Sequence, residues 1–279
     1  MRRILPALAA LALALPAAAG NRPPDLTGNA DLIVDQKVLE QHWIVRDETF
    51  PATFCSVVEG DVTPGDHRVI RFTVSTPNQG DADICIGDPN VHFAAGDGLY
   101  EMATCHNHFH FRHYAKYELI GADGRVWKAA KRGFCMIDVS PAPNVSDSAV
   151  KTWAYRICGR IGTPGNQGIS HGWADVYVWK LGGQYFVLDG GDGQPVVPAG
   201  TYTIRITVNP GFVAAPGEPC PNLSGGFCHQ LPESNYNNNV AEATVVIPDH
   251  PGKTGVGPGT NDQAPHDSDI HDDNGDPID

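Results

Sequence analysis

Three histidines, His106, His108 and His110, occupy every second position within the segment from Thr104 to His113. Alternate side chains of a β-strand point to the same face, so this spacing places three imidazoles in one row. A bend in the strand would gather them around one metal ion. Imidazole binds Cu, Zn, Fe and Ni, so the ligand type alone does not choose the metal. We therefore predict a metal site at these three histidines.

Two other interpretations of the row are a set of surface histidines and a purification tag. The row lies in the middle of the chain, among aromatic residues and next to Cys105, which argues against a tag. His113 follows closely, and three roles stay open for it: a fourth ligand, a hydrogen-bond donor to a ligand, or a surface residue.

The segment Cys105-His-Asn-His-Phe-His110, followed by Tyr117-Glu-Leu119, resembles the copper-binding segment of the lysyl oxidase family. The resemblance extends from about His67 to Ile247. It implies that His106, His108 and His110 bind copper.

Two further segments resemble the parts of the family that form its cofactor. The family's cofactor lysine stands four residues before the cysteine of a Phe-Cys pair, which here selects Lys131 before Cys135. The segment Gly168 to Tyr177 resembles the one that bears the cofactor tyrosine, which selects Tyr177. The resemblance implies that Lys131 and Tyr177 become joined as lysine tyrosylquinone. Nothing in the sequence brings them together beforehand, so we expect Lys131 to lie farther off, on a mobile loop, in an unprocessed chain.

The function that the resemblance implies is a copper-dependent amine oxidase. Such an enzyme uses dioxygen to convert primary amines, peptidyl lysine among them, to aldehydes, and releases ammonia and hydrogen peroxide. Proton abstraction from the substrate needs a positioned base. Asp175 shares a strand face with Tyr177 and matches the family's aspartate two residues before its tyrosine, so we predict that Asp175 is this base.

The alternative function is a secreted β-sandwich that binds Cu or Zn without catalysis, for metal handling or adhesion. A zinc hydrolase is disfavoured because no Glu or Asp base is evident near the histidines. The chain also departs from the animal enzymes: it is longer between the two cofactor segments, through Ser140 to Lys151, and has fewer cysteines around Tyr177. The choice between protein lysines, peptides and small amines stays open.

The elements that must position these residues are short strands separated by Gly and Pro. Trp173 to Trp179, Thr201 to Val208 and Val69 to Val74 alternate or are rich in β-formers. Tyr114 to Ile120 and Arg125 to Ala130 flank a turn and predict a hairpin. No segment has a sustained helical period, and Lys151 to Ile157 suits a strand or a short helix. We predict an all-β fold: one β-sandwich-like domain with long loops and little helix.

The chain divides into three parts by composition. Residues 1–19 have a basic start, an apolar run and a small-residue cleavage site, which predict a signal peptide. Residues 20–247 form the predicted catalytic domain. Residues 248–279 form an acidic, Gly- and Pro-rich tail that we expect to be disordered. The apolar run is too short for a membrane span, so we expect a secreted or periplasmic protein.

Seven cysteines agree with an oxidising compartment. Cys220 and Cys228 are close in sequence and are expected to close one loop. The family resemblance suggests pairs of Cys55 with Cys105 and of Cys135 with Cys158, which leaves Cys85 free. The net charge of −13 argues against nucleic acid. It favours cationic partners such as amines or lysine-rich proteins, although solubility alone explains it equally well.

Overall fold

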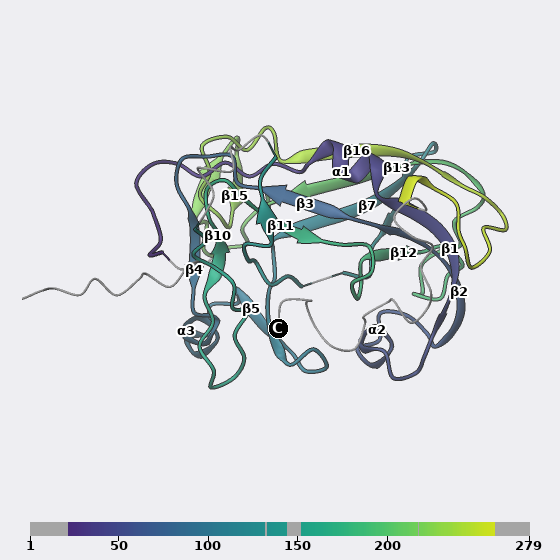
Figure 1. The fold of residues 1–279 in the computed structure, drawn as a ribbon, viewed down its shortest axis with the longest axis horizontal. Coiled ribbons are helices and arrows are strands. Elements are labelled where there is room, and N and C mark those ends of the chain that lie inside the picture. Colours follow the sequence, from purple (N-terminus) through teal and green to yellow (C-terminus); the bar gives the residue numbers. More distant parts are fainter. Residues whose placement is uncertain (1–21, 132, 144–151, 217, 260–279) are drawn as a thin grey trace, which may run out of the picture.

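The structure, a computed structural model, describes residues 22–131, 133–143, 152–216 and 218–259. Figure 1 shows a molecule built mainly from strands, which lie in several small antiparallel sheets. This confirms the all-β fold with little helix. The expected signal peptide and residues 260–279 of the expected tail lie outside the described ranges.

Three helices and sixteen strands are assigned within the described residues. The helices are α1 (Gln36–Gln41), α2 (Cys55–Val58) and α3 (Pro89–Ala95). The strands are β1 (Trp43–Phe50), β2 (Gly65–Phe72), β3 (Val74–Pro77), β4 (Ile84–Gly87), β5 (Tyr100–Ala103), β6 (His108–Phe111), β7 (Ala115–Gly121), β8 (Val126–Lys128), β9 (Ser140–Pro141), β10 (Gln167–Ile169), β11 (Trp173–Tyr177), β12 (Tyr185–Val187), β13 (Gly200–Val208), β14 (Asn222–Ser224), β15 (Phe227–His229) and β16 (Val240–Ile247). No helix in these ranges is long and apolar enough to cross a membrane.

The largest sheet has four strands in the order β16-β13-β7-β8. Buried and more exposed residues alternate along β13 and β16, because successive side chains of a strand point to opposite faces. The predicted hairpin is present, with Glu118 of β7 opposite Lys128 of β8. One face of this sheet therefore covers the core.

Two three-stranded sheets, β1-β2-β12 and β3-β11-β9, contribute the other side of the core. One cluster of buried side chains includes Val74 of β3, Ile204 of β13 and Ala243 of β16. The rings of Phe72 in β2 and Tyr117 in β7 pack edge to face, with centroids 5.4 Å apart. The sheets thus share one large apolar cluster, while Phe50 of β1, Val69 of β2 and Tyr185 of β12 belong to a second, smaller cluster.

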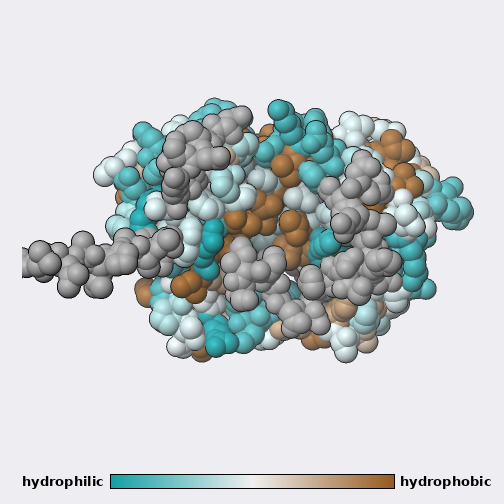
Figure 2. All heavy atoms as spheres, viewed as in Figure 1, coloured by the Kyte–Doolittle hydropathy of each residue, from teal (hydrophilic) through white to brown (hydrophobic). Residues whose placement is uncertain are grey.

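Strand β11 has two different faces, as its alternation predicts. Asp175 and Tyr177 are buried, whereas Val176 and Val178 are partly exposed. These two valines line a groove of about 440 Å³ on the outer face. Figure 2 shows apolar residues gathered near the middle of the face where Figure 1 draws β11.

Short helices occur where we predicted none. One of them is α3, which has Asp88 as its N-cap, Pro89 in its first turn and Gly96 as its left-handed C-cap, with φ 65°. Each residue is a known end signal for a helix. Helices of this length lack a full apolar period, which explains why periodicity does not reveal them.

Two other segments differ from expectation. Residues 152–157 form neither a helix nor a strand, apart from isolated bridge residues at Trp153 and at Ile157, of which Ile157 pairs with Asn166. Residues 248–259 are ordered along β1, so the expectation of disorder from Pro248 onward is wrong for this part. Val45 and Val256 exchange both backbone hydrogen bonds, at 2.9 and 2.8 Å. The amide of Asp47 donates to the carbonyl of Gly252.

The structure contains disulfides between Cys55 and Cys105, Cys135 and Cys158, and Cys220 and Cys228. Cys85 is a free, exposed thiol. All of these agree with the expected pairing. The first two bonds join segments that surround the predicted site residues.

Candidate metal and cofactor site

The predicted metal ligands lie on the hairpin formed by β5 and β6. His108 and His110 are on β6, but His106 lies in the turn before it, so the three histidines do not form one continuous strand row. The turn closes with a hydrogen bond from the amide of Asn107 to the carbonyl of Ala103, 2.8 Å long. Asn107 has φ 59°, a left-handed conformation that Asn adopts more readily than most residues. This turn supplies the bend that brings His106 back toward the strand.

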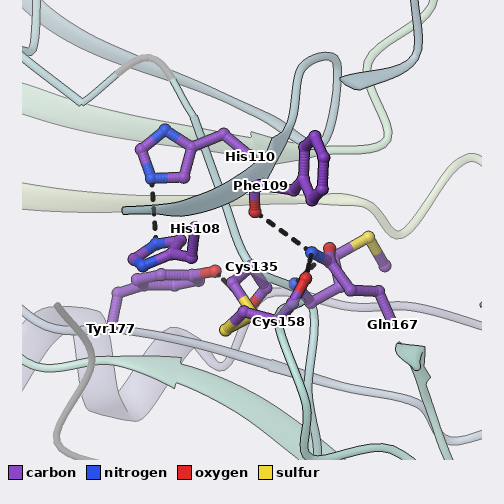
Figure 3. The surroundings of a disulfide bond; sticks show 8 residues. His108, Phe109, His110, Cys135, Cys158, Gln167 and Tyr177 are labelled. Atoms are coloured by element: carbon purple, nitrogen blue, oxygen red, sulfur yellow. Dashed lines mark hydrogen bonds between the residues drawn. A yellow bond between two sulfur atoms is a disulfide. The ribbon is translucent and has the colours of Figure 1, made fainter. Parts of the chain in front are cut away.

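The three imidazole rings lie close together. Ring centroids are 5.7 Å apart for His106 and His108, 5.5 Å for His106 and His110, and 4.9 Å for His108 and His110. The Nε2 atoms of His108 and His110 are 3.1 Å apart. Figure 3 shows these two nitrogens joined by a dashed line, and in this view the Tyr177 ring lies next to His108.

The histidine cluster fits copper in donor type and proximity. Neutral imidazole is a good ligand for Cu and Zn, and the Nδ1 atom of His106 is buried without a hydrogen-bond partner in the structure. In the described ranges, however, no three His, Cys, Asp or Glu side chains already converge as a metal site. Copper binding by the three histidines stays a prediction.

The electrostatic surroundings of His110 favour its neutral form. Burial lowers its pKa well below the usual value, and the positive charges of Lys131, His108 and His106 act in the same direction. Neutral imidazole is the form that coordinates metals. His113 is placed differently: its ring stacks on Phe212, with centroids 6.3 Å apart.

Tyr177 ends β11 and is almost fully buried, with 1% of its surface exposed. Its hydroxyl donates a 2.8 Å hydrogen bond to the carbonyl of Cys135, drawn in Figure 3. Its ring packs edge to face with Phe134, with centroids 5.3 Å apart. Cys135 forms a disulfide with Cys158. Gln167 Nε2 donates hydrogen bonds to the carbonyl of Cys158 and to the carbonyl of Phe109 in β6, so the disulfide is linked to the histidine strand. The phenol therefore has a fixed orientation.

Lys131 lies directly beside Tyr177. Its Nζ atom is 4.5 Å from the centre of the Tyr177 ring and 5.3 Å from that of Phe134. Our expectation that Lys131 lies farther off is wrong. Backbone pairing explains its position: the amide of Ala130 donates to the carbonyl of Tyr185, and Phe134 pairs with Phe111 of β6. Ala130 is thus bonded to β12 and Phe134 to the histidine strand, on either side of Lys131 in the sequence.

Asp175 is buried on the same face of β11 as Tyr177, with 1% of its surface exposed. It stands opposite Thr76 of β3. Tyr117 lies close to it: burial raises the pKa of this phenol well above its usual value, and the negative charge of Asp175 raises it further. Asp175 therefore lies in the core, two residues before Tyr177 on the same strand face.

A cavity of about 350 Å³ joins the lysine to the histidines. Asp175 is not among its lining residues, which are Ser56, Glu59, Asp61, Glu101, Met102, Ala103, Thr104, His106, His110, Ala130, Lys131, Gly133, Gly182 and Gly183. The three acidic members were not predicted from sequence. Glu59 and Asp61 follow α2, and the disulfide of Cys55 with Cys105 brings that segment to the histidine turn.

Known proteins resemble the chain over most of this region. The family model for lysyl oxidase matches residues 39–220, more than half of the 279-residue chain. This match begins earlier than His67 and ends before Ile247, the limits of the resemblance seen in the motifs.

Curated relatives were found in several vertebrates. Protein-lysine 6-oxidase of Rattus norvegicus is 28% identical over 200 residues, which cover 70% of this chain and 38% of that protein. Protein-lysine 6-oxidase of Homo sapiens is 26% identical over 237 residues, or 80% of this chain and 47% of that protein. Lysyl oxidase homolog 2 of Gallus gallus is 27% identical over 224 residues, or 78% of this chain and 24% of that protein. The matched region spans less than half of each of these three relatives. Together with the family match, these similarities identify the chain as a member of the lysyl oxidase family.

Proposed function

We propose that this protein is an exported copper-dependent amine oxidase that converts primary amines to aldehydes. The observation that carries the proposal is the position of Lys131 Nζ, 4.5 Å from the ring centre of Tyr177, on a cavity that His106 and His110 also line. The relatives' name, protein-lysine 6-oxidase, supports the same chemistry.

His106, His108 and His110 would hold the copper, and Lys131 and Tyr177 would form the lysine tyrosylquinone. Bound copper would promote oxidation of the Tyr177 ring by dioxygen. The quinone would then catalyse amine oxidation, in which a primary amine, dioxygen and water give an aldehyde, ammonia and hydrogen peroxide. The Cys135 carbonyl holds the phenol of Tyr177 in one orientation. Phe134 contacts both Lys131 and Tyr177 and restricts how they approach each other.

The substrates we propose are primary amines, including lysine side chains of peptides or proteins. These are cations at neutral pH. Glu59, Asp61 and Glu101 line the same cavity as Lys131, and their charge attracts such substrates. Asp175 is our candidate for the base that removes the substrate proton, because it lies on the Tyr177 face of β11.

Export is proposed from the signal-peptide pattern of residues 1–19. The disulfides support it, because such bonds persist in oxidising compartments and are rare in the cytosol.

The test is a visible spectrum of the purified protein after copper loading in air, followed by titration with phenylhydrazine and peptide mapping. A hydrazone band and a joined Lys131–Tyr177 peptide are expected, and Lys131→Arg is the control that should show neither. Copper binding without a quinone adduct would instead support a non-enzymatic metal-binding protein. Recovery of the two peptides separate and unmodified from active enzyme would refute the cofactor assignment.

A further inference from the structure

Gly183 lies against the backbone of Lys131. It is the third residue of the turn from Leu181 to Gln184, which is closed by a 3.3 Å hydrogen bond between the amide of Gln184 and the carbonyl of Leu181. Its φ of +70° is a left-handed conformation. A Cβ atom at this position would lie 3.1 Å from Lys131 Cα and 3.2 Å from Lys131 N, closer than ordinary van der Waals contact. A side chain here therefore requires the backbone of Lys131 to shift by a few tenths of an ångström.

The Gly183 turn cannot easily move away from Lys131. Arg71 Nη1 donates to the carbonyls of Trp179 and Leu181, at 2.9 and 3.1 Å. The guanidinium is itself held by two hydrogen bonds to Glu48, of 2.7 and 2.6 Å, and both side chains are fully buried. Breaking a buried ion pair is costly, so this anchor fixes the turn.

The backbones of Ala130 and Phe134, on either side of Lys131 in the sequence, are also held by hydrogen bonds. On one side the amide of Ala130 donates to the carbonyl of Tyr185, at 3.1 Å. On the other side Phe134 exchanges backbone hydrogen bonds with Phe111 of β6. A side chain at Gly183 would therefore displace the backbone of Lys131 between these two anchors, and with it the amine that lies over Tyr177.

We propose that Gly183 is a positioning residue, which holds Lys131 over the ring of Tyr177 before the two side chains are joined. This proposal rests on the proposed function, because the position of Lys131 affects the enzyme only if Lys131 and Tyr177 become joined. Once dioxygen has oxidised the Tyr177 ring to a quinone, joining forms a bond between Lys131 Nζ and a carbon of that ring. A ring hydrogen and an amine hydrogen leave as protons, and dioxygen accepts the two electrons. The rate of this step depends on the approach that Gly183 permits.

The test compares Gly183→Asn with Gly193→Asn. Both glycines are left-handed, with φ of +70° and +76°, but a Cβ at Gly193 meets no atom within 4 Å. Asn tolerates this conformation better than most residues, so backbone strain is small and equal in both variants. They differ in the contact with Lys131. Gly183→Ala serves as a smaller second variant if the Asn variant does not fold.

The first measurement uses metal-free protein labelled with ¹³C-lysine. In the wild type and in Gly193→Asn, the ε-methylene signal of Lys131, assigned with Lys131→Arg, should be shifted upfield by the aromatic rings and show cross-peaks to Tyr177. In Gly183→Asn both features should be lost. A wild-type spectrum without them, an unchanged Gly183 variant, or equal loss in both variants would overturn the proposal.

The second measurement follows the joined Lys131–Tyr177 peptide after copper is added in air. We expect its initial rate of formation to fall about tenfold in Gly183→Asn, because small misplacements of reacting atoms have large effects on rate, and to be unchanged in Gly193→Asn. Copper content should be equal in both. If the wild type forms no joined peptide while the contact is lost only in Gly183→Asn, the proposed function fails and the positioning role stands. An unchanged rate in Gly183→Asn would contradict the positioning role.

Discussion

Lys131 and Tyr177 are in contact, with the amine nitrogen 4.5 Å from the centre of the phenol ring. This distance is within the range of a cation–π interaction. The two residues come from different segments, one between β8 and β9 and the other at the end of β11. Because they are already in contact in the unjoined chain, formation of the proposed cofactor would require no large rearrangement of the backbone.

Replacing either member of this pair should separate metal binding from oxidation. Tyr177→Phe keeps the ring and removes the hydroxyl that donates to Cys135, which should cost about 1 kcal/mol of folding stability. Lys131→Arg keeps the charge and removes the amine nucleophile. Both variants should retain copper and produce no hydrogen peroxide from a primary amine, as metal analysis and a peroxide assay would show. Amine oxidation by either variant would exclude the quinone made from this pair.

Replacing any one of His106, His108 and His110 by Ala should abolish copper retention and therefore cofactor formation. The proposed site has three imidazole ligands, so a variant that lacks one of them has too few to hold copper. The matched control is His92→Ala, because this histidine lies on α3, where its Nδ1 atom is 2.7 Å from Asp97. Metal content after dialysis is the measurement. A cluster variant that keeps one copper per chain would refute that histidine as a ligand.

Removing the disulfide between Cys55 and Cys105 should weaken copper binding as well as lower the folding stability. It closes 50 residues and holds the turn that contains His106. Removing both cysteines should cost about 4 kcal/mol by chain entropy and weaken copper binding. Removing Cys220 and Cys228, which close only 8 residues, should cost about 2.5 kcal/mol and leave copper affinity unchanged. Denaturation curves and copper titration distinguish the two, and equal copper affinities would contradict the role of the first bond.

Asp175→Asn should keep copper and the joined cofactor but slow turnover by about 10²- to 10⁴-fold, the usual contribution of a general base. The carboxylate is removed while the size of the side chain is kept. Peptide mapping and steady-state kinetics measure the two effects separately. If turnover is unchanged, Asp175 is a core residue and another group removes the proton.

Stability should fall as pH rises through neutrality because of Glu233. Burial raises its pKa from 4.5 to about 7, against the lowering effect of hydrogen bonds from Asn209, Leu32 and Asn239. The native state therefore binds this proton more tightly than the unfolded state. The resulting stability is fully present below pH 4.5 and is lost as pH rises through about 7, by up to about 3 kcal/mol.

Denaturant unfolding at a series of pH values measures this effect, and Glu233→Gln should remove it. Glu242→Gln is the control, because this glutamate is exposed on β16 and pairs with Arg205. If Glu233→Gln keeps the pH dependence of the wild type, the source of the effect lies elsewhere.

The main strands and the site residues were predictable for two different reasons. Alternation along Trp173 to Trp179 and Thr201 to Val208 follows from burial of one strand face, so it is visible in the sequence. Lys131 and Tyr177 were found only through short motifs. Each residue alone has no feature that separates it from an ordinary surface lysine or core tyrosine.

What could not be predicted depends on contacts between distant segments. The approach of Lys131 to Tyr177 requires the close packing of Gly183, and that turn is held by Arg71 from β2. Glu59 lines the cavity because the disulfide between Cys55 and Cys105 holds its segment against the histidine turn. No local pattern carries such information, because each contact is decided by the packing of several sheets.

Residues 248–259 lie along the outer edge of strand β1 and so affect whether molecules of this protein associate through that edge. Strand β1 is the last strand of its sheet, and Val256 occupies the backbone groups of Val45 that face away from β2. An uncovered outer strand is a template for pairing with another chain and for aggregation. A chain ending at Ile247 would present β1 to solvent, and we expect it to self-associate. Residues 248–259 thus act as a cover that keeps the sheet from growing between molecules.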